Sequence, residues 1–217
     1  MDFLEKYDIN IENKQLLLTA LTHSSYANEH KTISYERLEY LGDAVLQLLI
    51  SDYLYKEESI NEGEMSKKRA SYVCEEALAE YAKNIGYIPY IRVGNGQKHK
   101  VNDTIIADVF EAILGVIYLD KGYKGAQRYI HQVVIPYIKK GSIFLADYKS
   151  ALQELTQMDK KTLDYVLLKE DGPAHDRTFE IEVKIDDMVF GKGVGKSKKD
   201  AEQQAAKDAF MRIAKNK

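Results

Sequence analysis

The chain has 217 residues, of which 45% are hydrophobic and 30% are charged, and its formal net charge is −3. A chain of this length can form one or two domains, and its composition is that of a globular protein rather than a disordered one. The single cysteine, Cys74, excludes a disulfide framework and a zinc cluster of cysteines within one chain. We see no signal-peptide pattern and no apolar run of the roughly 18–20 residues that span a membrane. We therefore expect a cytoplasmic protein that does not enter a membrane.

Helical periodicity dominates the first two-thirds of the chain. The spacing of apolar residues predicts a helix over residues 12–22, and Ser34 is expected to cap a longer helix that ends near Tyr55. Asn102 and Asp103 are expected to cap a later helix. The remaining elements predicted for this part are helices over residues 64–84, 104–119 and 124–139 and a loop over residues 88–102.

The pattern changes near residue 141, where strand signals begin to appear. A short helix is expected from about Lys149, followed by three strands at residues 163–169, 178–186 and 188–194 and a last helix with alanines at helical spacing. The order α-β-β-β-α predicts a three-stranded antiparallel sheet with both helices packed on one face. We therefore predict a two-domain α+β protein, with an all-α domain over residues 1–143 and an α-β-β-β-α domain over residues 147–217.

Three carboxylates share one face of the predicted helix that follows Ser34. Glu36, Glu39 and Asp43 stand at positions i, i+3 and i+7 within an otherwise apolar segment. Acids that are gathered on a buried face repel one another and lose solvation, and a bound cation would relieve both costs. Glu36 could instead complement the helix dipole, because it lies near the start of the helix.

A second acidic pair, Asp108 and Glu111, lies at i and i+3 in another apolar helix. Two such helices that face each other could form an oxygen-only site, which suits a hard cation such as Mg²⁺ or Mn²⁺. The pair could also form salt bridges with Arg37 or a lysine, so spacing alone leaves both interpretations open. A di-iron bundle is disfavoured, because no histidine stands in the Glu-x-x-His relation to these acids.

Basic side chains gather at the end of the chain. Residues 190–217 contain eight of them: Lys192, Lys196, Lys198, Lys199, Lys207, Arg212, Lys215 and Lys217. Only Asp200, Glu202 and Asp208 oppose this charge. A basic face can bind phosphates on a protein that is acidic overall, although a run of lysines is more often a solvated helix face.

Residues 36–46, ERLEYLGDAVL, closely resemble the signature helix of bacterial ribonuclease III. Residues 21–29, 63–70 and 107–120 are similar to further motifs of that family. The resemblance implies a homodimeric endonuclease that hydrolyses phosphodiester bonds in double-stranded RNA and leaves 5′-phosphate and 3′-hydroxyl ends. Precursors of ribosomal RNA and structured messenger RNAs are the substrates it implies. Two departures are a shorter loop over residues 94–102 and Ala44 at a position where serine is commoner.

The resemblance also implies roles for single acidic residues in the nuclease domain. Glu39, Asp108 and Glu111 match metal ligands for Mg²⁺, for which Mn²⁺ can substitute. Asp43 and Glu111 match carboxylates that are essential to the chemistry.

Three further positions of the nuclease domain match residues with supporting roles. Glu36 and Glu64 match auxiliary acids at the rim of the catalytic valley. Tyr40 matches an aromatic position of the dimer interface that inserts into the partner subunit. An ordinary core tyrosine is the alternative interpretation of Tyr40.

The α-β-β-β-α unit resembles a double-stranded-RNA-binding domain, which reads the shape of A-form RNA across successive minor grooves. The residues expected to contact RNA are Ser150, Gln153 and Glu154 on the first helix, His175 in the loop between the first two strands, and Lys196, Lys198 and Lys199 at the start of the last helix. The lysines and the helix N-terminus together suit phosphate.

Two other functions compete with a double-strand-specific nuclease. The protein could hold duplex RNA without cutting it, or it could be a metal hydrolase for small phosphorylated substrates. The metal ligands and the essential carboxylate of the family are all matched, by Glu39, Asp43, Asp108 and Glu111, and this favours cleavage over simple binding. The attached RNA-binding domain disfavours a small substrate.

Overall fold

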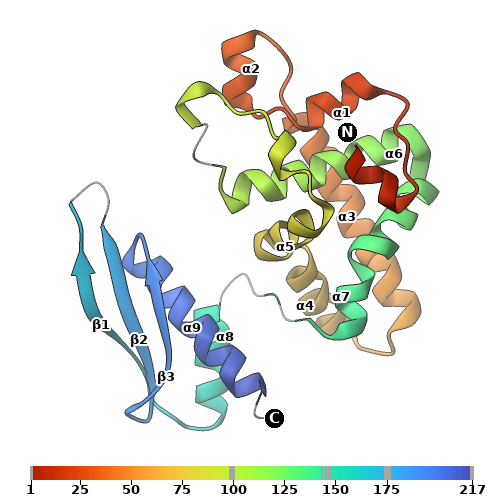
Figure 1. The fold of residues 1–217 in the computed structure, drawn as a ribbon. Helices are drawn as coiled ribbons and strands as arrows, with labels where there is room; N and C mark the ends of the chain where they lie inside the picture. Colours follow the sequence, from red (N-terminus) through yellow and green to blue (C-terminus); the bar gives the residue numbers. More distant parts are fainter. Residues whose placement is uncertain (1, 98–100, 143, 145–147, 174–176, 216–217) are drawn as a thin grey trace. The chain divides into compact units, whose positions relative to one another are not determined.

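A computed structural model of the chain describes residues 2–97, 101–142, 144, 148–173 and 177–215. The chain divides into two compact units, residues 1–144 and 145–217, each with its own hydrophobic core. The predicted domain ends at residues 143 and 147 lie outside the described residues. The order of the elements confirms the predicted fold class, an all-α domain followed by an α-β-β-β-α domain (Figure 1).

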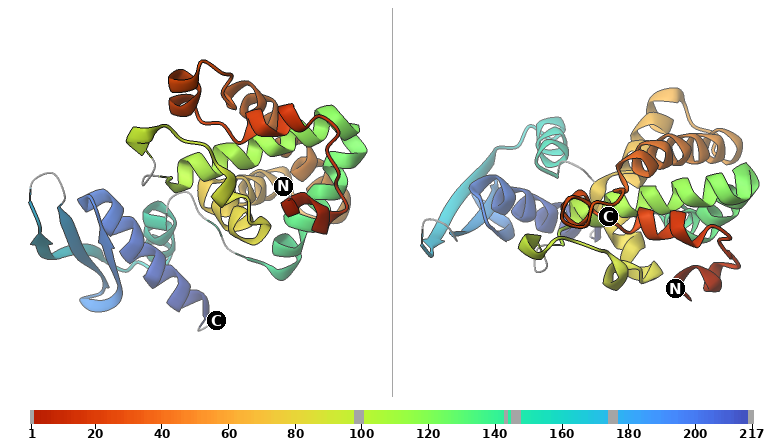
Figure 2. Two further views of the ribbon diagram at one scale, coloured as in Figure 1. Left: turned by 45° about the horizontal axis from the view of Figure 1, so that its top comes forward. Right: turned by 90° about the horizontal axis from the view of Figure 1, so that it is seen from above.

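The first unit is built around two long helices that lie side by side (Figures 1 and 2). Its elements are η1 (Asp2–Tyr7), α1 (Lys14–Ala20), α2 (Ser24–His30), α3 (Glu36–Glu57), α4 (Glu62–Tyr72), α5 (Glu75–Ile85), η2 (Ile88–Tyr90), η3 (Asn95–Gln97), α6 (Asp103–Val133) and α7 (Ile135–Lys140). The central pair is α3 and α6, and fully buried side chains such as Leu46 and Ile50 of α3 and Phe110 and Ile113 of α6 fill the core between the helices. No helix in the described part of the chain is long and apolar enough to cross a lipid bilayer.

The ends of several helices differ from the sequence prediction. Ser34 does not cap α3, because Tyr35 occupies the N-cap position and the Ser34 hydroxyl donates to the Glu36 carboxylate at 2.6 Å. The helix expected over residues 64–84 is two helices, α4 and α5. Tyr72 is the last residue of α4, and its carbonyl accepts a hydrogen bond from the Tyr81 hydroxyl of α5 at 3.2 Å.

Helix α6 contains a break close to the one that the sequence predicted between residues 119 and 124. It bends at Gly122, whose φ of 68° is a conformation that glycine adopts without strain, and continues to Val133. The predicted helix over residues 124–139 is therefore shared between α6 and α7, and Pro136 lies in the first turn of α7. The predicted cap is confirmed, because the Asn102 side chain accepts from the Ile105 N–H at 3.1 Å.

Two glycines allow α3 and α6 to approach very closely. A Cβ atom on Gly42 would overlap the backbone carbonyl of Glu111. A Cβ atom on Gly115 would lie 2.5 Å from the carbonyl oxygen of Leu38. The two helices therefore touch backbone to backbone at this crossing, which lies beside the acidic residues of both.

The second unit is a three-stranded antiparallel sheet with two helices on the same face (Figure 2). Its elements are α8 (Tyr148–Met158), β1 (Leu163–Asp171), β2 (Thr178–Ile185), β3 (Met188–Gly195) and α9 (Lys198–Lys215). The central strand β2 pairs with both neighbours, so that Val183 lies between Tyr165 of β1 and Gly191 of β3. Asp186 and Asp187 both have positive φ, as a two-residue hairpin turn of type I′ requires.

Small residues bring α9 onto the sheet. Three glycines of β3 face three alanines of α9: Gly191, Gly193 and Gly195 against Ala201, Ala205 and Ala209. A Cβ atom on any of the glycines would overlap the backbone of α9. The backbone of β3 therefore fixes the position of α9, including its lysine-rich start.

Candidate active site and nucleic-acid interface

The crossing of α3 and α6 brings together four of the acids that the sequence singled out. Glu39 and Asp43 come from α3, and Asp108 and Glu111 come from α6. The carboxylates of Glu39, Asp108 and Glu111 are half-buried, whereas that of Asp43 is exposed and accepts a hydrogen bond from Gln47 at 3.3 Å. The close backbone contact at the two glycines is what places acids from different parts of the chain opposite one another.

Burial and mutual repulsion perturb these acids. Burial raises the pKa of Glu111 to about 8, and the charges of Asp43, Glu39 and Asp108 add to the effect. Burial also raises the pKa of Glu39, again with contributions from Asp108 and other neighbouring carboxylates. Such perturbed groups in a cluster are typical of functional sites.

Asp108 has two neighbours that favour its ionised form. Burial raises the pKa of Asp108, and the hydrogen bond from Tyr35 and the charge of His23 oppose that rise. The Tyr35 hydroxyl donates to Asp108 Oδ2 at 2.9 Å. Arg37 is not among the charges that shift Asp108 or Glu111, so the alternative of a salt bridge to Arg37 is not supported.

The acids face one another without forming a closed coordination shell. Among the described residues, no three carboxylate, histidine or cysteine side chains are arranged as a preformed metal site. The shared repulsion nevertheless shows that the four carboxylates lie within electrostatic reach of one another. All their ligand atoms are oxygens, which suit Mg²⁺ or Mn²⁺.

The two predicted rim acids lie in different surroundings. Glu36 is exposed at the start of α3, and its charge contributes to the raised pKa of Glu39. Glu64 is exposed on α4, where it forms a capping box: its carboxylate accepts from the Asn61 N–H at 3.2 Å. Glu64 is not among the charges that shift the core acids, so its local contacts are those of a helix cap.

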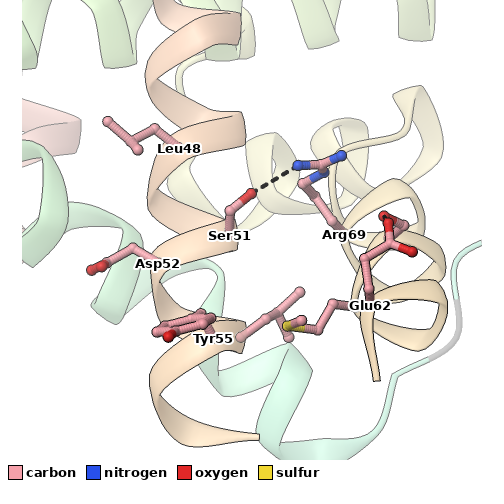
Figure 3. A pocket seen from close by; sticks show the side chains of 9 residues that line it. Leu48, Ser51, Asp52, Tyr55, Glu62 and Arg69 are labelled. Carbon is pink, nitrogen blue, oxygen red and sulfur yellow. Dashed lines mark hydrogen bonds between the residues drawn. The ribbon is translucent and has the colours of Figure 1, made fainter. Parts of the chain in front are cut away.

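Tyr40 projects from α3 and is not a core side chain. It is 83% exposed, and Leu48 and Tyr55 further along α3 are 54% and 77% exposed. A cavity of about 450 Å³ lies between α3 and α4, and Figure 3 shows Leu48 and Tyr55 in its lining. Arg69 donates to the Ser51 hydroxyl at 2.9 Å in the same cavity. The cavity contains none of the four core acids, so it is a feature distinct from the acidic site.

In the second unit, the residues expected to contact RNA are largely on the surface. Ser150, Gln153 and Glu154 are exposed on α8, while Leu152 and Thr156 point into the core. Helix α8 therefore has one polar outer face, as a helix that contacts an RNA groove requires. His175 lies outside the described residues.

The start of α9 combines exposed lysines with a capped helix terminus. Lys196, Lys198 and Lys199 are all exposed. Ser197 caps the helix, because its hydroxyl accepts from the Asp200 N–H at 3.1 Å, and Asp200 in turn accepts from the Lys196 N–H at 3.0 Å. The lysines therefore project from a rigid turn.

Comparison with known proteins identifies the family. Residues 13–138, more than half of the chain, match the family described as ribonuclease-III-like, and residues 148–212 match the double-stranded RNA binding motif. The chain is 46% identical over 214 residues to ribonuclease 3 of Onion yellows phytoplasma, a match that covers 97% of this chain and 90% of that protein. The chain belongs to the ribonuclease III family.

Further members of the ribonuclease III family support the same conclusion. Ribonuclease 3 of Streptococcus uberis is 45% identical over 217 residues, with 96% of this chain and 94% of that protein covered. The solved nuclease domain of ribonuclease III from Campylobacter jejuni aligns with a TM-score of 0.57 and 33% identity, over 61% of this chain and 94% of that domain. The resemblance seen in the sequence is confirmed. A ribonuclease III nuclease domain joined to a double-stranded RNA binding motif makes this family member an endoribonuclease for double-stranded RNA.

Sequence reasoning did not identify Tyr35 as part of this site. A tyrosine that precedes an acidic helix carries no spacing signal of its own. Its role becomes visible only when folding brings α6 beside the start of α3, because its partner Asp108 is 73 residues away in the chain.

Proposed function

We propose that this endoribonuclease depends on a divalent cation, Mg²⁺ or in its place Mn²⁺, held between α3 and α6. The observation that carries the proposal is the crossing of α3 and α6, which gathers Glu39, Asp43, Asp108 and Glu111 beside a backbone-to-backbone contact. In keeping with this arrangement, burial and the neighbouring carboxylates raise the pKa of Glu111. A group of acids that repel one another in a half-buried place is destabilising unless a cation binds there. Glu39, Asp108 and Glu111 would hold the cation.

The other acidic residues are assigned to the chemical step and to the rim of the site. When bound, such a cation supplies a water molecule of lowered pKa and stabilises the charge that develops on the leaving oxygen. Asp43, which is exposed on α3, would orient the attacking water and accept its proton. We assign Glu36, whose charge acts on Glu39, to the rim of the site. The rim role that the resemblance implies for Glu64 stays a prediction, because the contacts of Glu64 are those of a helix cap.

The experiment that tests this function uses a long, perfectly paired RNA. The protein is incubated with the duplex in Mg²⁺, in Mn²⁺ and with a chelator, and the sizes and ends of the products are determined. Short duplexes with 5′-phosphate and 3′-hydroxyl ends, formed only with metal, are the expected result. An intact RNA that is shifted on a gel would instead favour a binder that does not cut, and hydrolysis of nucleotides would favour a small-molecule hydrolase.

We also propose that the working form is a homodimer in which the exposed apolar side chains of α3 are covered. Tyr40, Leu48 and Tyr55 form a solvent-exposed apolar stripe that is costly to leave in water. The neighbouring cavity of about 450 Å³ offers space for an aromatic side chain of a partner subunit. We assign Tyr40 of each subunit to the cavity of the other. The solved Campylobacter jejuni nuclease domain is described as flexible in a region involved in dimer formation. Light scattering at micromolar concentration tests this proposal, and a monomeric mass would contradict it.

The substrates proposed from the family are precursors of ribosomal RNA and structured messenger RNAs. Contacts from the exposed residues of α8, the loop that contains His175 and the lysines at the start of α9 favour duplex shape over base sequence. A cytoplasmic location, where such transcripts are made in bacteria, stays a prediction. Sequencing the ends of transcripts that accumulate when the protein is depleted would identify the natural substrates.

A further inference from the structure

Tyr35 lies between the two helices that carry the acids. It occupies the N-cap position of α3, and its side chain is only 2% exposed. Its hydroxyl donates to Oδ2 of Asp108 on α6 at 2.9 Å. One residue thus marks the start of the first acidic helix and holds an acid of the second.

Several contacts fix the position of Tyr35. Its N–H donates to the Thr22 carbonyl at 2.9 Å, and its own carbonyl accepts from the Glu39 N–H at 2.9 Å. Its ring packs against that of His23, with the ring centroids 5.7 Å apart. The His23 N–H donates to the Arg92 carbonyl at 3.0 Å, which ties this segment to the loop before α6. The tyrosine ring therefore has little freedom to follow Asp108 if that carboxylate turns.

Other buried tyrosines of the unit use their hydroxyls differently. Tyr72 donates to the Ser142 carbonyl at 2.8 Å, and Tyr87 donates to the Ile106 carbonyl at 2.6 Å. These bonds satisfy a buried hydroxyl and need no further explanation. The acceptor of Tyr35 is a carboxylate, so the bond is charge-assisted and also fixes the orientation of a side chain that could otherwise rotate.

We propose that Tyr35 is a positioning residue for the cation site: its hydroxyl holds one carboxylate oxygen of Asp108 and thereby sets the orientation in which Asp108 meets the cation. This inference rests on the proposed function of the acidic site. Hydrogen-bond partners of metal ligands typically affect metal affinity or activity by about 10- to 100-fold. Tyr35 does not itself touch the cation or the RNA in this assignment.

The test replaces Tyr35 by phenylalanine in the full chain and measures the response to Mg²⁺ in two ways. The first measurement is the rise in Tm with Mg²⁺ concentration, which needs no catalysis. The second is the Mg²⁺ dependence of the cleavage rate at saturating duplex RNA. We expect both Mg²⁺ midpoints to rise about 10-fold or more in Tyr35→Phe, whereas binding of the duplex in a chelator stays unchanged.

Tyr72→Phe is the matched control, because it also removes a buried tyrosine hydroxyl with a bond of similar length. It should lower the Tm without moving either Mg²⁺ midpoint. Equal midpoints in Tyr35→Phe and Tyr72→Phe would overturn the positioning role. A wild-type protein that does not cut duplex RNA in Mg²⁺ would overturn the proposed function itself, so the two failures are distinguishable.

A second comparison uses Asp108→Ala as the background, because this change removes the acceptor of the Tyr35 hydroxyl. Adding Tyr35→Phe to this variant should leave the Mg²⁺ midpoint of the Tm shift where Asp108→Ala places it, since the two residues act through one contact. A further rise in the double variant would show that Tyr35 acts through another group and would also overturn the proposal.

Discussion

The carboxyl group of Glu111 is half-buried and has three negatively charged neighbours, and burial together with these charges raises its pKa to about 8. Asp43, on the opposite side of the same crossing, is open to solvent. The two carboxylates therefore suit different tasks: a half-buried group suits binding of a cation, and an exposed one suits exchange of protons with water. Substitutions of single residues separate these tasks from the binding of RNA.

Glu111→Gln should reduce cleavage of duplex RNA at least about 100-fold, because it removes charge where the cation would bind. The rise in Tm on addition of Mg²⁺ should also disappear. Duplex binding measured by gel shift in a chelator should be unchanged, since the RNA-binding unit is untouched. Glu57→Gln, at the exposed end of α3, is the control and should cut normally. Cleavage at the wild-type rate by Glu111→Gln would remove this residue from the site.

The double substitution Lys198→Ala with Lys199→Ala should weaken duplex binding for all sequences alike. Each phosphate contact that is lost should reduce the slope of log affinity against log salt by about 1. The control is Lys160→Ala with Lys161→Ala, a second exposed pair in the same unit that follows α8. An unchanged salt slope in the first variant would exclude these lysines from the phosphate contacts.

At the scale of helices and strands, the sequence predicted which elements exist better than where they end. The alternation of residues 178–186 predicted β2, and Asn102 predicted the start of α6, because both signals are local. The break between α4 and α5 is held by a hydrogen bond between Tyr81 and the Tyr72 carbonyl, which apolar periodicity does not reveal. The site follows the same rule. The acids could be predicted from their spacing and from the family motifs. The contact of Tyr35 with Asp108 could not, because it depends on the packing of α3 against α6.

The crossing of α3 and α6 predicts a large difference between two glycine substitutions. Gly115→Ala should lower the free energy of unfolding by about 1–3 kcal/mol, because the added methyl group would force the helices apart. It should also weaken Mg²⁺ binding, since the acids of α3 and α6 would separate. Gly63→Ala is the control: its nearest neighbour would be Asn61 Oδ1 at 3.4 Å, and alanine favours an exposed helix by about 0.5–1 kcal/mol. Urea titrations with and without Mg²⁺ measure both effects, and equal stability of the two variants would contradict the close approach.

Asp120, near the middle of α6, joins this helix to the start of α1. Its carboxylate accepts from the N–H groups of Glu12 at 3.0 Å and Asn13 at 3.2 Å. Burial opposes ionisation, but these two hydrogen bonds and Lys121 outweigh burial and lower the pKa of Asp120. A lowered pKa stabilises the folded state above the unfolded value of about 3.9, and this stability is lost as the pH falls through the folded value.

Asp120→Asn should therefore lower the free energy of unfolding by about 1–2 kcal/mol at pH 7. The difference from the wild type should shrink as the pH falls below about 4, since the wild-type carboxyl group then takes up its proton. Denaturant titrations at several pH values measure this difference, with the exposed Asp164→Asn as the control. A difference that is constant down to pH 3 would rule out the charge of Asp120 as its source.

At the scale of the whole molecule, the acidic residues and the RNA-binding motif lie in different units. The acids at the crossing of α3 and α6 belong to residues 1–144, and the exposed lysines at the start of α9 belong to residues 145–217. Each unit has its own buried core, so each is expected to fold without the other. Duplex RNA would then be captured mainly by one unit and cut by the other.

Deletion of residues 148–217 should leave a folded dimer with a normal rise in Tm on addition of Mg²⁺. Cleavage should become limited by substrate capture, so KM for duplex RNA should rise about 10-fold or more while the rate at very high RNA concentration falls less. Light scattering and cleavage at several RNA concentrations measure these quantities. A monomeric truncated chain would place part of the dimer contact in the second unit.

The contact between the β3 glycines and the α9 alanines leaves α9 little freedom to move relative to the sheet. Because only alanine methyl groups lie between strand and helix at this contact, α9 has little room to tilt, and the lysines at its start are carried on a rigid support. We therefore expect the domain to fit a nucleic-acid helix of one geometry and to bind helices of other geometries less well. Redesigning it for a nucleic acid with different groove dimensions would have to begin at Gly191, Gly193 and Gly195 rather than at the lysines.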